Sequence, residues 1–290
     1  VSLPDSHRNT FFDLAFGKNV LMNDSDFNII AEKHGSLADM AAQLLRSAKL
    51  IPAALFVRLP LRDISAQDRF AKQHNMIIVE TRDIDQYSHE AASLVKIVAR
   101  ARVPLAVSED AEIVMFRAEI GGEEHFAVLI GNGANSDTPL VRLHSQCITG
   151  DILGSLKCDC GEQLQAAMEL MAQVGGGILV YLAQEGRDIG LLNKMRAYAL
   201  QDDGLDTVDA NHALGFETDE RLFLPAARIL QALNVSKIQL ITNNPDKISQ
   251  LGQHGISVTS RVPLALSTNP HNKNYLKTKK TRTGHLFDEI

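Results

Sequence analysis

The spacing of hydrophobic and polar positions predicts which segments of the chain are helices and which are strands. In the first hundred residues, segment 36–48 starts with a Ser cap and carries apolar residues at helical spacing, and 87–101 has the pattern of another amphipathic helix. The apolar runs at 51–59 and 76–80 are typical of buried strands. This part of the chain is therefore predicted to be mixed α/β.

The pattern changes near residue 104. Segments 112–120 and 125–131 flank a Gly-Gly-Glu-Glu turn, which predicts a hairpin. Strand and helix patterns then alternate, which favours an α/β layer fold with ligand sites in the loops beyond the strand ends. The predicted strands are 139–145, 178–182, 237–242 and 256–262, and the predicted helices are 161–173, 189–203 and 244–251. The fold class predicted is mixed α/β (α+β), with a smaller N-terminal domain at 1–104 and a larger domain at 105–290.

Composition and charge narrow the class of protein. With 45% hydrophobic and 22% charged residues, the chain has enough apolar side chains for a sizeable core. No apolar run approaches the roughly 18 residues of a membrane span, and no signal pattern opens the sequence. A net charge of -6 argues against a nucleic-acid coat protein, and the basic run at 273–282 is expected to be a solvated tail. We expect a cytoplasmic protein without membrane or nucleic-acid partners.

All three cysteines of the chain fall in one short stretch, at Cys147, Cys158 and Cys160. Three thiolates can bind zinc and leave the fourth tetrahedral position for a water whose pKa falls towards about 7, which is the catalytic arrangement. A closed structural site, with His144 or another side chain as fourth ligand, is the alternative. Three buried cysteines acting as small hydrophobes are a further alternative, which the neighbouring Lys, Asp and Glu residues disfavour.

Polar residues follow the predicted strand 178–182, in a loop of the kind that often carries binding and catalytic residues. Gly186 permits a tight loop, Glu185 can orient a water or a base, and Arg187 can bind a phosphate. An ordinary strand-to-helix connection with an Arg–Glu pair is the alternative interpretation.

The helix predicted at 189–203 carries a polar stripe of Lys194, Tyr198 and Gln201. A tyrosine hydroxyl on such a stripe can donate to a reacting water or steer it. The alternative is that Tyr198 is simply a residue at the rim of an amphipathic helix.

Asp219 and Arg221 are two positions apart, so they share a side only in an extended segment. Pro225 predicts that the next helix begins near it, which leaves Asp219 and Arg221 side by side in the lead-in. A capping segment beginning at Thr218 is the alternative.

A second strand-to-helix junction lies at 242–247. Asn244 is the predicted N-cap and Pro245 the first helical residue. Because a helix N-terminus presents free backbone N–H groups, this junction suits a phosphate, with Thr242 and Lys247 placed to assist.

Six motifs in this order and spacing resemble those of GTP cyclohydrolase II, the enzyme that opens riboflavin biosynthesis, over roughly residues 105–287. They are VRLHSQCITGD, SLKCDCGEQL, YLAQEGRDIGLLNKMRAYALQDDGLDTVDAN, LGFETDER, LITNNPDK and NPHNKNYLKTKKTRTGHLF. The resemblance implies hydrolysis of GTP at C8 of guanine, dependent on Zn²⁺ (one per chain) and on Mg²⁺ at the GTP phosphates. Formate and pyrophosphate leave, and a diamino-pyrimidinone ribosyl phosphate remains. It also implies a homodimer.

The resemblance further implies roles for single residues. Cys147, Cys158 and Cys160 are implied as zinc ligands. Asp219 is implied as proton acceptor and Tyr198 as the tyrosine that supports ring opening. Arg221 is implied as a nucleophile towards the α-phosphate, but a guanidinium is protonated at ordinary pH, so phosphate stabilisation is its simpler physical role. The implied GTP contacts are Arg142, Leu143, His144, Ser145, Gln146, Gln163, Glu185, Gly186, Arg187, Thr207, Thr242 and Lys247.

The chain departs from the family pattern at two places. Gln146 replaces the usual Glu, which removes a charge beside the metal ligands. Residues 1–104 lack the motifs of dihydroxybutanone-phosphate synthase, which is fused there in many relatives, so we expect no second activity and a scaffold, interface or regulatory role. The alternative functions are a related hydrolase of another purine or pyrimidine, as in uracil catabolism, and a non-enzymatic GTP-binding regulator with a structural zinc.

Overall fold

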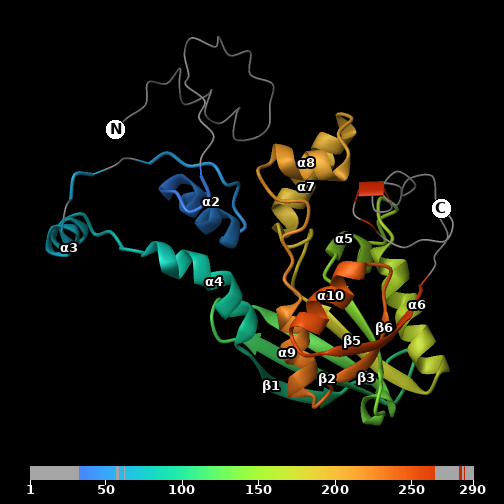
Figure 1. Ribbon diagram of the computed structural model, residues 1–290. Coiled ribbons are helices and arrows are strands. Elements are labelled where there is room, and N and C mark those ends of the chain that lie inside the picture. The colour runs from blue at the N-terminus through green and yellow to red at the C-terminus, as the bar shows by residue number, and fades with distance from the viewer. Residues whose placement is uncertain (1–32, 57–58, 62, 265–280, 283, 285–290) are drawn as a thin grey trace. The chain divides into compact units, whose positions relative to one another are not determined.

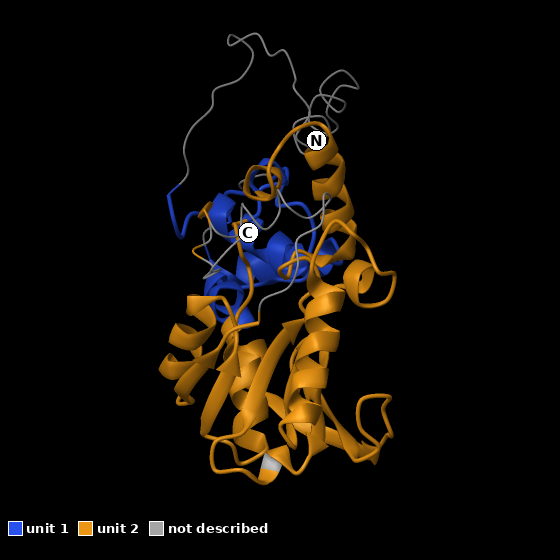
Figure 2. Cartoon of the chain, turned by 90° about the vertical axis from the view of Figure 1, so that its right-hand side faces the viewer, with its two compact units in different colours: residues 1–88, 212–216 blue, residues 89–211, 217–290 orange. Residues whose placement is uncertain are grey.

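The structure, a computed structural model, divides into two compact units (Figure 2). It describes residues 33–56, 59–61, 63–264, 281–282 and 284. The first unit comprises 1–88 and 212–216, and the second comprises 89–211 and 217–290. Most of the basic run at 273–282 lies outside the described residues. None of the helices in the described ranges is long and apolar enough to cross a membrane.

The first unit is helical over its described residues. Helix α2 (Leu37–Ser47) confirms the prediction for 36–48, because the Ser36 side chain caps it by accepting a backbone N–H of the first turn at 3.2 Å. Helix α3 (Ile64–Gln73) is capped in the same way by Asp63. Helix α4 (Thr81–Ser93) starts in this unit and ends in the second.

The two strands predicted for this unit are wrong. Segments 51–59 and 76–80 have no strand structure at their described positions, and no strand occurs elsewhere in the described part of 33–88. An apolar run becomes a strand only where another strand satisfies its backbone groups, and Ile77 in the second run is 91% exposed. The described N-terminal region is therefore helical, where a mixed α/β region was expected.

The helix predicted at 87–101 is also wrong over its second half. Helix α4 ends at Ser93, and strand β1 (Val95–Arg102) follows. Val95 and Ile97 of β1 lie opposite strand β2 (Ala111–Ala118) in an antiparallel pair, so tertiary pairing outweighs the helical spacing. Strand β1 thus belongs to the second unit, and the division between units falls after Ser88, earlier than the expected boundary at residue 104.

The second unit is built on a mixed sheet of seven strands among the described residues, in the order β1-β2-β3-β5-β4-β6-β7 (Figure 1). The first part, from β1 to β5, is antiparallel, and β5, β4, β6 and β7 run parallel to one another. The remaining strands are β3 (Glu124–Gly131), β4 (Leu140–Ser145), β5 (Gly176–Leu182), β6 (Lys237–Ile241) and β7 (Ser257–Val262). The predicted hairpin and all four predicted later strands are confirmed.

Helices cover both faces of this sheet and complete an α/β/α layer arrangement (Figure 1). Residues of α6, such as Ala167 and Met171, pack on one face, and residues of α9 and α10, such as Ile229 and Leu251, pack on the other. The helical segments of the second unit are η1 (Gly133–Asn135), α5 (Ile148–Asp151), α6 (Cys160–Gln173), α7 (Gly190–Asp202), α8 (Thr207–Ala213, whose end belongs to the first unit), α9 (Leu224–Ala232) and α10 (Pro245–Gln253). The fold class is mixed α/β, as predicted.

Two backbone segments touch where β3 leaves the sheet. A Cβ atom on Gly133 would lie 2.0 Å from the Gly177 nitrogen and 2.2 Å from the Gly176 carbonyl carbon. Gly176 itself has φ 141°, a conformation that favours glycine. This contact lets the loop at 131–139 cross the start of β5 without side chains between the two backbones.

We expect Gly133→Ala to lower the free energy of unfolding by about 1–3 kcal/mol or more, because backbone atoms must move to admit the new methyl group. Urea unfolding of the purified protein measures the change. Gly252→Ala is the matched control: its Cβ would meet nothing within 4 Å, and alanine in α10 should add about 0.5–1 kcal/mol. Equal stability of the two variants would contradict the close contact at Gly133.

Candidate metal centre and cationic pocket

The site lies where three neighbouring parallel strands end. The carboxyl ends of β4, β5 and β6 meet at one edge of the sheet, and each is followed by a segment that turns into a helix. Open α/β sheets bind ligands at this edge. The segment after β4 carries Cys147, the segment after β5 carries Arg187, and the segment after β6 carries Lys247.

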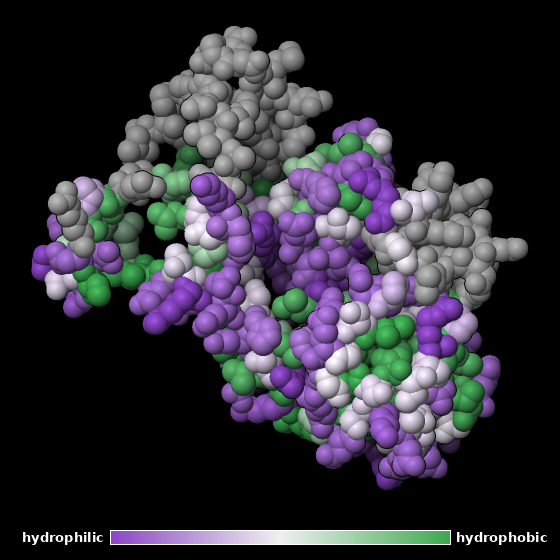
Figure 3. Space-filling model, viewed as in Figure 1, coloured by the Kyte–Doolittle hydropathy of each residue, from purple (hydrophilic) through white to green (hydrophobic). Residues whose placement is uncertain are grey.

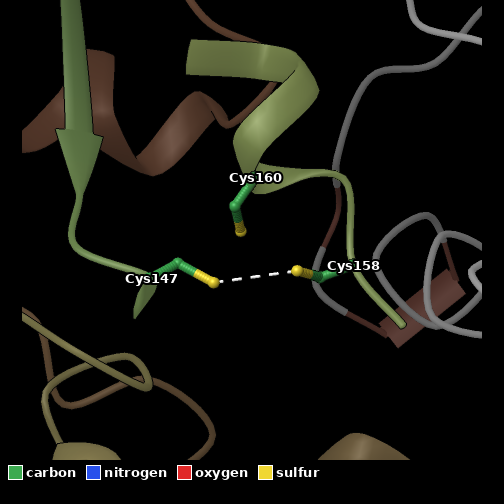
Figure 4. Close-up of side chains that lie close together, drawn as sticks. All are labelled: Cys147, Cys158 and Cys160. Carbon is green, nitrogen blue, oxygen red and sulfur yellow. Dashed lines mark hydrogen bonds between the residues drawn. The ribbon is translucent and has the colours of Figure 1, made fainter. Parts of the chain in front are cut away.

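The three cysteine sulfurs converge as the sequence predicts. All three Sγ atoms lie within 4.8 Å of one another, and the Sγ atoms of Cys147 and Cys158 are 3.7 Å apart (Figure 4). Tetrahedral zinc with Zn–S distances of about 2.3 Å needs sulfurs about 3.8 Å apart, so the spacing fits one such ion. A Cβ on Gly150 would lie 2.9 Å from the Cys158 sulfur, so a glycine at this position leaves the space beside the sulfurs open.

In the part of the chain that the structure describes, the sulfurs have no fourth protein ligand. Among the described residues, no His, Asp, Glu or further Cys joins the three sulfurs in the cluster. His144, the fourth ligand named in the closed-site alternative, directs Nε2 at the Asp151 carboxylate, 3.0 and 3.1 Å from its two oxygens. Over the described ranges, the donor set of three thiolates thus leaves one tetrahedral position without a protein ligand.

Asp151 anchors the segment that carries Cys147. Its Oδ2 accepts hydrogen bonds from the Cys147 backbone N–H at 3.0 Å and from the Tyr181 hydroxyl at 2.8 Å, in addition to the contact with His144. Burial lowers the pKa of His144, although Asp151 acts in the opposite direction. Burial, and then the Asp151 carboxylate, raises the pKa of Tyr181, so its hydroxyl keeps its proton and remains a donor.

A buried ammonium group lies beside the sulfurs. Lys194 Nζ, on α7, donates to Cys147 Sγ at 3.1 Å, to Thr149 Oγ1 at 2.9 Å and to Glu185 Oε1 at 2.7 Å. Burial on its own would lower the pKa of Lys194, but Glu185 and Cys147 raise it, so the amine stays charged. Hydrogen bonds from Cys158 and Cys160, and further ones from Thr149 and Lys194, lower the pKa of Cys147.

A solvent-open cavity of about 140 Å³ adjoins the sulfurs. Its lining is strongly cationic, and no Asp or Glu of the described residues is part of it. The lining cations are Arg142, Arg187, Lys194, Arg221 and Lys247. In a chain of net charge -6, such a concentration of positive charge attracts an anionic ligand. Figure 3 shows hydrophilic surface below α7 and α8 in the same view as Figure 1.

Backbone carbonyls hold most of these cations in place. Lys247 Nζ donates to the Leu143 carbonyl at 2.8 Å, and Arg187 Nη1 donates to the Thr218 carbonyl at 2.9 Å. Arg142 donates to the Ile241 carbonyl at 3.0 Å and also to Gln163, while its Nε has no hydrogen-bond partner among the described residues. These carbonyl acceptors are neutral, so they orient the three side chains without adding a negative charge.

The loop after β5 has an unusual backbone. Gly186, Arg187 and Asp188 have φ values of 66°, 60° and 75°, which is rare for residues other than glycine. The carbonyl of Arg187 accepts the Glu220 N–H at 3.2 Å, so this loop is joined to the segment that leads into α9. The tight loop predicted at Gly186 is confirmed, and three successive residues form it.

Asp219 and Arg221 form the side-by-side pair that Pro225 predicts. Residues 217–223 have no regular structure, and α9 begins at Leu224. Arg221 donates through Nε and Nη2 to the two Asp219 oxygens, at 2.7 and 2.5 Å, and through Nη1 to Ser145 Oγ at 3.3 Å. Burial raises the pKa of Asp219, but the Arg221 guanidinium outweighs this effect, so its pKa lies below the ordinary value.

The junction after β6 also has the predicted form. Asn244 caps α10 by accepting the Asp246 N–H at 2.9 Å, and Pro245 is the first helical residue. Thr242 Oγ1 accepts the Asn244 N–H at 3.0 Å. The positive N-terminal end of α10 therefore faces the same cavity that Thr242, Asn244 and Lys247 line.

The sequence model of the GTP cyclohydrolase II family matches residues 96–263 of this chain. This chain belongs to the GTP cyclohydrolase II family.

The names of similar curated proteins support this family assignment. GTP cyclohydrolase-2 of Azospirillum brasilense is 48% identical over 253 residues, covering 87% of this chain and 66% of the relative. GTP cyclohydrolase-2 of Salmonella typhimurium is 48% identical over 194 residues, covering 67% of this chain and 98% of the relative. Riboflavin biosynthesis protein RibBA of Bacillus subtilis is 44% identical over 218 residues, covering 75% of this chain and 54% of the relative. The chain thus spans only part of its longer relatives.

One solved structure aligns weakly. RibBX of A. baumannii, described as a two-domain 3,4-dihydroxy-2-butanone 4-phosphate synthase, aligns with a TM-score of 0.38 and 17% identity, covering 81% of this chain and 60% of that chain. This similarity is too low to support a conclusion about fold or function.

Sixteen of the eighteen expected site residues line the cavity of this GTP cyclohydrolase II family member. The cysteines, Tyr198 and Arg221 are among them. The others are Arg142, Leu143, His144, Ser145, Gln146, Gln163, Gly186, Arg187, Thr207, Thr242 and Lys247. The lining does not include Glu185 and Asp219, whose carboxylates contact Lys194 and Arg221.

The sequence did not predict the contacts that Lys194, Asp151 and Gln184 make in the site. It placed Lys194 on a polar stripe without a role, and it gave none to Asp151. Lys194 lies four residues before Tyr198, a spacing that places both side chains on one face of the helix. Asp151 lies four residues after Cys147, which places it near this cysteine in the sequence. Gln184 was missed as well: it accepts from Ser145 Oγ at 3.2 Å and donates to the Leu222 carbonyl at 2.7 Å.

We expect Asp219→Asn to lower the free energy of unfolding at pH 7, with an effect that shrinks in acid. A carboxyl whose folded pKa is lowered adds stability above its unfolded pKa of about 3.9, and this contribution is lost as the pH falls through the folded value. Urea unfolding of wild type and variant between pH 7 and pH 3 measures the difference. Asp137→Asn, on an exposed loop, is the control and should stay within about 0.5 kcal/mol of wild type. A difference between wild type and Asp219→Asn that grows in acid would contradict the pairing.

Proposed function

We propose that this chain hydrolyses GTP at C8 of guanine and releases formate and pyrophosphate, leaving 2,5-diamino-6-(ribosylamino)pyrimidin-4-one 5'-phosphate for riboflavin biosynthesis. One observation carries the proposal: among the described residues, a cluster of three sulfurs without a fourth protein ligand borders a cavity lined by five cationic side chains and no carboxylate. Membership of the GTP cyclohydrolase II family supports it.

Cys147, Cys158 and Cys160 are the residues that would hold zinc, with one ion per chain. Three thiolate donors at this spacing suit zinc better than magnesium or calcium, which prefer oxygen ligands. Bound zinc would supply Lewis acidity for the hydrolysis. Mg²⁺ is proposed to accompany the GTP phosphates.

The phosphates of GTP are proposed to bind at the cationic side of the cavity. Arg187, Arg221 and Lys247 are held by protein acceptors, so their charges are in position before the ligand arrives. The N-terminal end of α10 adds backbone N–H groups to the same region. The remaining proposed GTP contacts come from Arg142, Leu143, His144, Ser145, Gln146, Gln163, Gly186, Thr207 and Thr242.

Asp219, Arg221 and Tyr198 are the proposed catalytic group. Asp219 is kept ionised by Arg221, as a proton acceptor must be. Arg221 is protonated and bound to Asp219, which supports phosphate stabilisation as its role in place of nucleophilic attack. The ammonium groups of Lys157 and Lys194 lie 5.2 and 5.8 Å from the centre of the Tyr198 ring, and Tyr198 lines the same cavity as the three cysteines.

Assembly and location are further proposals. The family resemblance supports a homodimer, which light scattering on the purified protein tests. The three thiols are unpaired and close together, an arrangement that a reducing cytoplasm preserves.

We expect wild-type protein with GTP, Mg²⁺ and Zn²⁺ to release formate and to bind about one zinc per chain. Cys158→Ser should lose zinc and lower formate release by at least about 100-fold, because a metal ligand is removed. Mass spectrometry of the products and metal analysis measure both effects, and circular dichroism checks that the fold is retained. Ser155→Ala, on the same loop and outside the sulfur cluster, is the matched control with expected wild-type activity.

Other outcomes identify the alternatives. A preference for a purine or pyrimidine without a triphosphate would replace GTP hydrolysis with a related hydrolase activity. GTP binding without turnover, with both metals present, would indicate a regulator with a structural zinc.

A further inference from the structure

Lys194 lines the cavity, yet its donors point into the protein. The residue is only 8% exposed. A lysine ammonium group has three N–H donors, and Lys194 has three protein acceptors: Cys147 Sγ, Thr149 Oγ1 and Glu185 Oε1. The hydrogen bonds of Lys194 are therefore fully used within the protein, and none remains for a substrate phosphate.

Glu185 fixes the direction of this ammonium group. Its Oε1 accepts from Lys194 at 2.7 Å, and its Oε2 accepts from the Ile148 backbone N–H at 2.7 Å. Ile148 directly follows Cys147, so one carboxylate holds both the lysine and the chain segment of the sulfur that the lysine contacts. Glu185 is absent from the cavity lining, which agrees with a role inside the protein.

We propose that Lys194 is a positioning residue for the metal centre: its N–H bond to Cys147 Sγ, aimed by Glu185, fixes that thiolate and reduces the electron density it donates to a bound metal. This inference rests on the proposed function, since it requires a metal at the three sulfurs. Groups that hydrogen-bond to metal ligands orient those ligands and tune the metal. Lys194 contacts one of the three sulfurs, so the three thiolates are unequal donors.

Cobalt(II) in place of zinc gives a direct readout, because sulfur-to-cobalt charge transfer absorbs in the near ultraviolet. A hydrogen bond to sulfur lowers the energy of its lone pairs and raises the transition energy. We therefore expect Lys194→Met to shift this band to longer wavelength with about one cobalt still bound per chain, and Lys194→Arg, which keeps a donor, to reverse part of the shift. Absorption spectra of the cobalt-loaded full chain measure the band.

Lys157→Met is the matched control. Lys157 also carries an ammonium group near the Tyr198 ring, but it donates to Asp202 at 2.6 Å and not to a sulfur. We expect no shift of the band in this variant. Equal shifts in both lysine variants would show a general charge effect and overturn the proposal.

Lys194→Met leaves the Glu185 carboxylate without its cation, which can prevent folding. The double variant Lys194→Met, Glu185→Gln avoids this problem, and it is compared with Glu185→Gln alone. The double variant should show the longer-wavelength band, and an unchanged band would overturn the proposal.

Turnover adds a second distinction. We expect Lys194→Met to lower kcat for GTP about 10–100-fold and to change KM little, because Lys194 has no donor for substrate. A raised KM with an unchanged band would make Lys194 a substrate ligand and overturn the proposal. If wild-type protein itself shows no thiolate–cobalt band, the metal centre of the proposed function fails, and Lys194 has no metal to tune.

Discussion

The convergence of three sulfur atoms on one point is the constraint on which the rest of the site depends. Cys147 follows β4, whereas Cys158 lies just before α6 and Cys160 begins it, so two backbone segments must approach closely. Glycines make this possible: a Cβ on Gly161 would lie 2.2 Å from the Gly150 carbonyl oxygen, and a Cβ on Gly150 would crowd the sulfurs. The close packing around the sulfurs thus requires glycine at positions 150 and 161 of the segment that joins β4 to α6.

The charge of the pocket follows from how its cations are held. Lys247 and Arg187 donate to main-chain carbonyls, which fix their positions without cancelling their charge. The carboxylates near the site are used differently: Asp219 binds Arg221, and Asp151 binds backbone and side-chain donors around Cys147. An acidic protein thereby keeps a positive cavity whose groups do not need to reorganise when an anion binds.

Local rules predicted the parts of this structure that depend on local chemistry. Ser36 caps α2, Asn244 caps α10, and Pro225 places the start of α9, so Asp219 and Arg221 fall side by side. The parallel strands were predicted from short apolar runs between helical patterns. The convergence of the cysteines was predicted from their spacing alone.

The errors arise where distant parts of the chain decide the outcome. The segment 76–80 has the composition of a strand but no strand beside it, and β1 follows helical spacing but pairs with β2. The partners of Lys194 lie up to 47 positions away in the sequence. Its place on the polar stripe of α7 could therefore be predicted from the sequence, but its contact with Cys147 could not. Sequence reasoning likewise could not show that Glu185 points away from the cavity.

The place of β1 in the sheet determines how the C-terminal unit can be isolated. A fragment starting at residue 105 would lack this strand, and the hydrogen-bonding edge of β2 would be bare. Helix α9 would lose its contacts with β1. The core residues Phe116 and Val114 would then lie on the edge strand of the sheet. An open strand edge of this kind recruits strands from other molecules. A fragment that keeps the sheet complete therefore has to begin before Val95.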